Sequence, residues 1–211
     1  MLESGELLVD GNLFEALVWA AENGHVAVVE LLLQDECVDP SANDNCAIRL
    51  AALSGHLAVV ERLLRDKRVD PSADNSYAIR WAAHFGHLAV VERLLQDVRV
   101  DPSADDNYAV RSAAQKGRLA VVERLLQDVR VNPSVNNNQA VRWAAHFGHL
   151  AVVDRLLEDD RVDAAVAIRH SRPDHRRRFE CRERLTEICI GLQDLELPAW
   201  VTVQILDAAR P

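Results

Sequence analysis

Histidines are the side chains in this sequence best suited to bind a metal or to move protons, and there are eight of them. Four follow a glycine, and an arginine takes the corresponding place once, giving the set His25, His56, His87, His149 and Arg118. Zinc needs ligand nitrogens about 2 Å away, whereas packed helices lie about 8–10 Å apart, so histidines on separate helices cannot converge on one ion. His84 and His87 could supply two ligands, but no third ligand is near them in the sequence. We therefore predict no metal and no cofactor.

The sequence carries none of the short motifs of catalysis. It has no G-x-S-x-G turn, no phosphate-binding glycine loop and no H-E-x-x-H pair. Glu92 and Glu123 are each followed by arginine, which is typical of solvated surface pairs. We predict that the protein is not an enzyme, and a metal-dependent enzyme is the weaker alternative.

The composition excludes several classes of protein. Of the 211 residues, 49% are hydrophobic and 27% are charged, and no stretch approaches the ~18 apolar residues of a membrane span. The start shows no secretory signal, and the four cysteines lack Cys-x-x-Cys spacing, which favours reduced thiols inside a cell. A net charge of −9 argues against binding nucleic acid. We predict a cytoplasmic monomer without a membrane or nucleic-acid partner; delivery into a host cell is possible, but no feature of this chain indicates it.

Glycine and proline recur at a fixed interval of 31 residues, at Gly24, Gly55, Gly86, Gly117 and Gly148 and at Pro40, Pro71, Pro102 and Pro133. A constant period of this length is the signature of a stacked repeat array. We predict an N-terminal lead-in (1–11), a C-terminal segment (167–211) and, between them, five repeats: 12–42, 43–73, 74–104, 105–135 and 136–166.

One repeat, 74–104, predicts helix, turn, helix and loop. A first helix runs from Tyr77 to Phe85, and Gly86 supplies the left-handed residue that ends it. A second helix runs from His87 to about Gln96 with an apolar face. Such short helices are unstable alone in water, so each repeat must be covered by its neighbour. The predicted fold class is an all-α helical-repeat solenoid, which lacks the deep enclosed pocket usual for catalysis.

The stretch Trp-Ala-Ala-His-Phe-Gly-His-Leu-Ala-Val-Val-Glu-Arg-Leu-Leu from Trp81 to Leu95 resembles the ankyrin repeat pattern T-P-L-H-x-A-A-x-x-G-H-x-x-x-V-x-x-L-L. The match recurs five times, although Tyr77-Ala78-Ile79-Arg80 replaces T-P-L-H and each unit is short; this variant is similar to arrays of protists and large DNA viruses. The resemblance implies a non-enzymatic protein-interaction module. It also implies that the Gly-His imidazole caps and braces its turn.

A helical wheel of the first helix places Ile79, Ala82 and Ala83 in the core and leaves a second stripe on the other side. In the ankyrin family this stripe lines the concave surface that holds protein partners. The predicted partner-binding residues are Trp19, Tyr77, Trp81, His84, Phe85, Tyr108, Ser112, Gln115, Lys116, Trp143, His146 and Phe147. Exposed aromatic residues are common interface anchors. The alternative is that the tryptophans fill gaps between adjacent first helices.

The loops are rich in acid, with Asp97, Asp101, Asp105 and Asp106 in one of them. Such an edge would steer a basic partner toward the array. The alternative is a solvated edge that keeps the protein soluble.

After Asp163 the repeat pattern stops. A predicted amphipathic helix from Pro173 to Gln193 and a final helix after Pro198 would cap the last repeat. Leu197-Pro198 followed by Ile205-Leu206 also resembles the opening of an F-box, which implies a second candidate function, a substrate adaptor of a ubiquitin ligase, such as a pathogen or viral effector.

Overall fold

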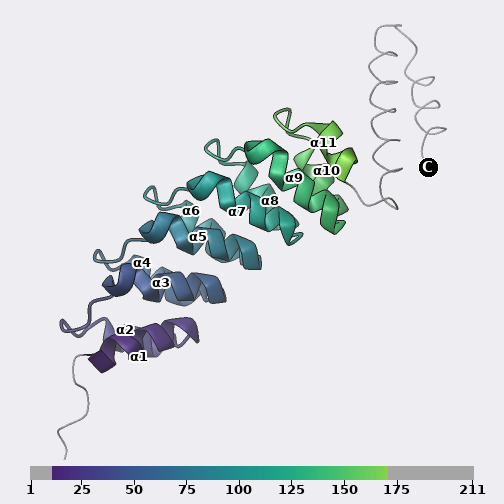
Figure 1. The fold of residues 1–211 in the computed structure, drawn as a ribbon. Helices are drawn as coiled ribbons and strands as arrows, with labels where there is room; N and C mark the ends of the chain where they lie inside the picture. The colour runs from purple at the N-terminus through teal and green to yellow at the C-terminus, as the bar shows by residue number, and fades with distance from the viewer. Residues whose placement is uncertain (1–10, 171–211) are drawn as a thin grey trace, which may run out of the picture.

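The computed structural model describes residues 11–170, which form an open stack of paired helices (Figure 1). The first helices of the pairs are α1 (Gly11–Glu22), α3 (Ala42–Ser54), α5 (Ala73–Phe85), α7 (Ala104–Gln115) and α9 (Val135–Phe147). The second helices are α2 (Val26–Leu32), α4 (Leu57–Leu64), α6 (Leu88–Leu95), α8 (Leu119–Leu126) and α10 (Leu150–Leu156). No strand occurs in this part of the chain, and the predicted all-α repeat array is confirmed.

A last helix, α11 (Ala164–His170), packs against α9 as each first helix packs against the one before it. The predicted lead-in up to residue 10, the helices after Pro173 and the F-box-like segment lie outside the described residues.

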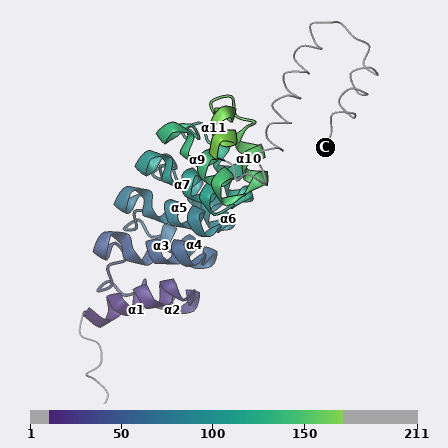
Figure 2. The ribbon, with the colours of Figure 1, turned by 45° about the vertical axis from the view of Figure 1, so that its right-hand side comes forward.

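The helices form two layers, one of first helices and one of second helices (Figure 2). Loops run along one side of the stack, and the short Gly-His turns run along the other (Figure 1). Within residues 11–170, no helix has the length and hydropathy needed to cross a membrane.

The core is built from alanine pairs and one branched residue of each first helix from α3 to α9, together with branched residues of the second helices. Ile79, Ala82 and Ala83 are fully buried, as predicted, and so are Val91 and Leu94 of α6. Because alanine has no side chain beyond Cβ, neighbouring first helices can pack closely along the stack.

Four of the first helices begin with three residues in the left-handed conformation. In α5 these are Asp74, Asn75 and Ser76, with φ between 53° and 55°; the others are 43–45, 105–107 and 136–138. Eleven of the twelve are Asn or Asp, the types that adopt this conformation most readily after glycine. The regular helix therefore begins at Tyr77, as predicted. The third residue also joins repeats, because Ser76 Oγ accepts a hydrogen bond from the Asp101 amide at 3.0 Å.

The imidazoles of the Gly-His turns join neighbouring repeats and cap no helix of their own. His87 Nε2 donates to the Leu53 carbonyl at 2.9 Å, and His56 does the same to the Glu22 carbonyl. The ring lies directly over the glycine of the preceding turn. The implied capping role is thus wrong, while the histidines do brace a turn by hydrogen bonds, namely the turn of the repeat before.

The loops are joined in the same way by arginine. Arg99 Nη1 donates to the Val69 carbonyl at 3.0 Å, while Nε and Nη2 bind the Asp97 carboxylate. The hydrogen bonds from Arg99 hold the pKa of Asp97 below its ordinary value. The arrangement recurs with Arg68, Arg130 and Arg161. These contacts between repeats hold the first helices in register.

Candidate functional site

Three aromatic residues of the predicted stripe are exposed on the first-helix layer. The exposed fractions are 57% for Trp19, 42% for Phe85 and 48% for Phe147. Phe85 is the last residue of α5 and Phe147 the last of α9, so both lie at the turn side of the stack. Large apolar side chains left in water at matching places in two repeats are candidate anchors for a partner.

Each of these phenylalanines lies between two imidazoles. The Phe85 ring centroid is 5.0 Å from that of His84 and 6.3 Å from that of His87. Phe147 has the same relation to His146 and His149, at 5.0 and 6.4 Å. The flanking rings restrict the phenylalanines, which lowers the entropy that a partner would have to remove on binding.

Trp81 is partly buried in a cluster of rings. Its centroid lies 5.6 Å from Tyr77, 5.2 Å from His84 and 6.1 Å from Tyr108 of the next repeat. This packing across α5 and α7 supports the alternative that the tryptophan fills the space between first helices. Trp143 is likewise partly buried.

Tyr77 and Tyr108 are held between arginines that the predicted stripe did not include. Arg49 lies over the Tyr77 ring at 4.9 Å, and Arg80 lies within 5.8 Å of both tyrosines. Such distances allow cation–π attraction. Arg80 also forms an ion pair with Asp105 at 2.9 Å. The two tyrosines are therefore partly buried and in contact with arginines. We call this alternating series of arginines and tyrosines along the first helices the ladder.

The ladder continues through Arg111, whose guanidinium lies 5.7 Å from the Tyr108 ring and binds the side chain of Gln139. Asn136 stands where earlier repeats have the aspartate partner, which explains the change of acceptor. The sequence contained a signal for these arginine–tyrosine contacts, because an arginine follows three residues after each tyrosine.

The three predicted contact residues of repeat four, apart from Tyr108, differ from one another in exposure. Ser112 is 1% exposed, and its hydroxyl donates to the Ala109 carbonyl at 3.2 Å. Ser112 is thus not available to a partner, which corrects the prediction. Gln115 is partly buried, whereas Lys116 is exposed.

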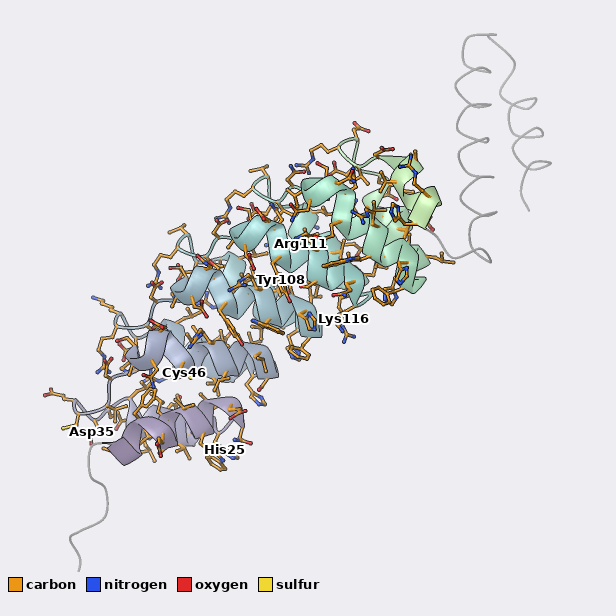
Figure 3. The ribbon with its side chains drawn as sticks, viewed as in Figure 1. His25, Asp35, Cys46, Tyr108, Arg111 and Lys116 are labelled. Atoms are coloured by element: carbon orange, nitrogen blue, oxygen red, sulfur yellow. The ribbon has the colours of Figure 1, made fainter. Side chains whose placement is uncertain are left out.

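The turn side of repeats three to five carries cations and no carboxylates. The segments 81–91, 112–122 and 143–153 contain no Asp or Glu. We call this surface the turn edge and define it by His84, Phe85, His87, Lys116, Arg118, His146, Phe147 and His149. Figure 3 shows Lys116 at the end of α7 on this side and Asp35 on the opposite, loop side.

The pKa of His84 is affected by the charge of the turn edge. Burial, followed by the positive charges of Lys116 and Arg118, lowers the pKa of His84 below its ordinary value. Its Nδ1 is buried without a hydrogen-bond partner among the described residues. Burial and the two cations therefore disfavour the charged form of this imidazole.

This shift predicts a pH dependence of stability. When the folded pKa of a histidine is lowered, the unfolded chain binds more protons below about pH 6.5, so stability falls as the pH drops through that range. We expect the free energy of unfolding to fall less in the His84→Gln variant than in the native protein when the pH is lowered from about 7.5 to about 5.5. Urea unfolding at both pH values measures the difference. Equal losses would show that His84 does not contribute.

Metal binding finds no support in residues 11–170, where no three His, Cys, Asp or Glu side chains converge on one point.

Comparison with known protein families finds a match over most of the chain. The family model described as "Ankyrin repeats (3 copies)" matches residues 3–75 and 79–167. No curated protein matches the chain.

Proposed function

Because the chain belongs to the ankyrin repeat family, whose members are generally protein-interaction modules and typically non-catalytic, we propose that it binds a protein segment in the cytoplasm along the first-helix layer. The observation that carries this proposal is the exposure of Phe85 and Phe147 at matching places two repeats apart. Trp19 extends the exposed aromatic surface to the first repeat.

The remaining stripe residues contribute unequally to the proposed surface. Lys116 and His146 are exposed and can contact a partner directly, while His84 and Gln115 are partly buried beside them. Tyr77, Trp81, Tyr108 and Trp143 are partly buried and form the floor of the surface. Most of the binding energy is therefore assigned to the exposed phenylalanines, since exposed anchors bury the most new area.

A basic partner steered by the loop carboxylates receives less support. Asp97 and Asp105 are bound by Arg99 and Arg80, and Asp101 accepts two hydrogen bonds from Ser103. Carboxylates that already have partners within the chain attract an outside cation less strongly.

We expect the double substitution Phe85→Ala and Phe147→Ala to weaken partner binding at least about tenfold, which corresponds to about 1.4 kcal/mol. The test starts from a displayed library of random peptides selected on the intact protein. Peptides from the selection are then titrated against native and substituted protein by fluorescence anisotropy. Because both side chains are nearly half exposed and lie at helix ends, the helical circular dichroism should stay nearly unchanged.

A matched control is available on the opposite side of the stack. Val98 and Val129 are 91% and 93% exposed at successive loop tips, so Val98→Ala with Val129→Ala also removes two exposed apolar side chains one repeat apart. This control should leave binding intact. Peptides that bind the phenylalanine variant as tightly as the native protein, or a selection that yields no binder, would contradict the proposed function.

A further inference from the structure

The turn edge shows a regular alternation of chemistry between repeats. Phe85, Lys116 and Phe147 occupy the same position in repeats three, four and five, at intervals of 31 residues. All three are exposed. The edge therefore presents an apolar group, a cation and an apolar group in a row, each on a neighbouring first helix.

The cation in the middle has no counter-ion among the residues that the structure describes. Neither Lys116 nor Arg118 forms an ion pair within residues 11–170. The acid-free segments are followed, on the second helices, by Glu92, Glu123 and Asp154, each adjacent to an arginine. Uncompensated positive charge at an exposed surface attracts negative charge and suppresses basic partners.

His84 is within electrostatic reach of these two cations. The lowering of its pKa arises from burial and from Lys116 and Arg118, and no carboxylate opposes that effect. The ring lies 5.0 Å from Phe85, so the cations of repeat four lie close to the aromatic anchor of repeat three.

We infer that the turn edge of repeats three to five binds a protein segment in which an acidic side chain lies between two apolar ones. This inference rests on the proposed function and adds the chemistry of the partner. Phe85 and Phe147 contact the apolar side chains, and Lys116 with Arg118 binds the carboxylate between them.

The spacing of the repeats sets the spacing in the partner. Adjacent packed helices lie about 8–10 Å apart, and an extended chain advances about 3.3 Å per residue. One repeat therefore matches about three residues of an extended segment. The fitting pattern is an apolar residue, an acidic residue about three positions later and a second apolar residue about three positions after that.

A protein segment fits this edge better than a nucleic acid does. A nucleic acid needs many cations along its path, whereas the turn edge has two permanently charged side chains, Lys116 and Arg118, within a chain of net charge −9. Two cations between two apolar anchors suit a single carboxylate or a pair of them.

The test uses three fluorescein-labelled synthetic peptides with two leucines flanking a central pair of glutamates, glutamines or lysines at that spacing. We expect the glutamate peptide to bind the native protein about tenfold more tightly than the glutamine peptide and the lysine peptide to bind least. Lys116→Glu leaves Arg118 beside a carboxylate, so the glutamate peptide should lose its advantage over the glutamine and lysine peptides. The glutamate affinity should fall with added salt.

Lys67→Glu is the matched control, because Lys67 is exposed at a loop tip on the other side of the stack. It makes the same charge change and should leave the order of the three peptides unchanged. Helical circular dichroism of both variants reports whether the fold is intact.

The possible failures are distinct. Equal binding of the glutamate and glutamine peptides, lost on Phe85→Ala with Phe147→Ala, would overturn the inference and leave the proposed function standing. Weak binding by all three peptides, or an equal effect of Lys116→Glu and Lys67→Glu, would overturn the inference. A labelled oligothymidine that binds the turn edge more tightly than the glutamate peptide would overturn it in favour of nucleic acid.

Discussion

Gly55→Ala is expected to lower the free energy of unfolding by about 2–4 kcal/mol. Gly55 has φ 81°, and a left-handed residue with a Cβ costs about 1–2 kcal/mol. A Cβ at this position would also lie 2.5 Å from Nδ1 of His87. The imidazole would have to move away and give up its hydrogen bond to Leu53, which is worth about 0.5–1.5 kcal/mol. Urea unfolding followed by circular dichroism measures the loss.

A double-mutant cycle separates the two causes. With His87→Ala in place, the ring that a methyl group would meet is gone, and only the backbone strain at Gly55 remains. The double variant should therefore be more stable than the sum of the single losses predicts, by about 1 kcal/mol. Strict additivity would mean that the ring and the glycine do not depend on each other.

Valine at the middle residue of three left-handed turns is expected to destabilise the array by about 3–6 kcal/mol in total. The residues are Asn75, Asp106 and Asn137, which are exposed and have φ between 53° and 57°. A β-branched side chain raises the cost of the left-handed conformation to about 1–2 kcal/mol per residue, with no exposed contact to offset it. Thermal and urea unfolding of the triple variant give the magnitude.

Glycine at the same three positions is the control. Glycine removes the same polar side chains but adopts the left-handed conformation freely. The free energy of unfolding of the triple glycine variant should therefore be within about 1 kcal/mol of that of the native protein. Similar destabilisation by valine and glycine would show that the side chains themselves, and not the backbone conformation, carry the effect.

The general fold could be predicted because its signals are local and repeated. Gly86 in the left-handed conformation, the buried pair Ala82 and Ala83, and the start of the regular helix at Tyr77 all agree with the prediction. Each depends on a residue type whose preference acts within a few positions along the chain, and repetition made each signal visible several times.

The candidate site could be predicted only in part. Phe85 and Phe147 are exposed as a wheel drawn for a single helix predicted, but Ser112 is buried. A wheel separates two faces of one helix and contains nothing about the helices on either side. Exposure at Ser112 depends on the size of the side chains at the same position in the flanking repeats, which is a property of the stack.

By itself, the sequence determined the period, the order of helices and turns, and the residue types along each face, because these follow from backbone preferences and from the need to bury short apolar helices. Only the tertiary structure decided which residues face one another across repeats: His87 over Gly55, Arg99 at the Val69 carbonyl, and Arg49 over the Tyr77 ring. These partners are 28 or more residues apart in the chain, and stacking alone brings them into contact. Distances between side chains of different repeats depend on how the repeats pack, and local preference does not specify that packing.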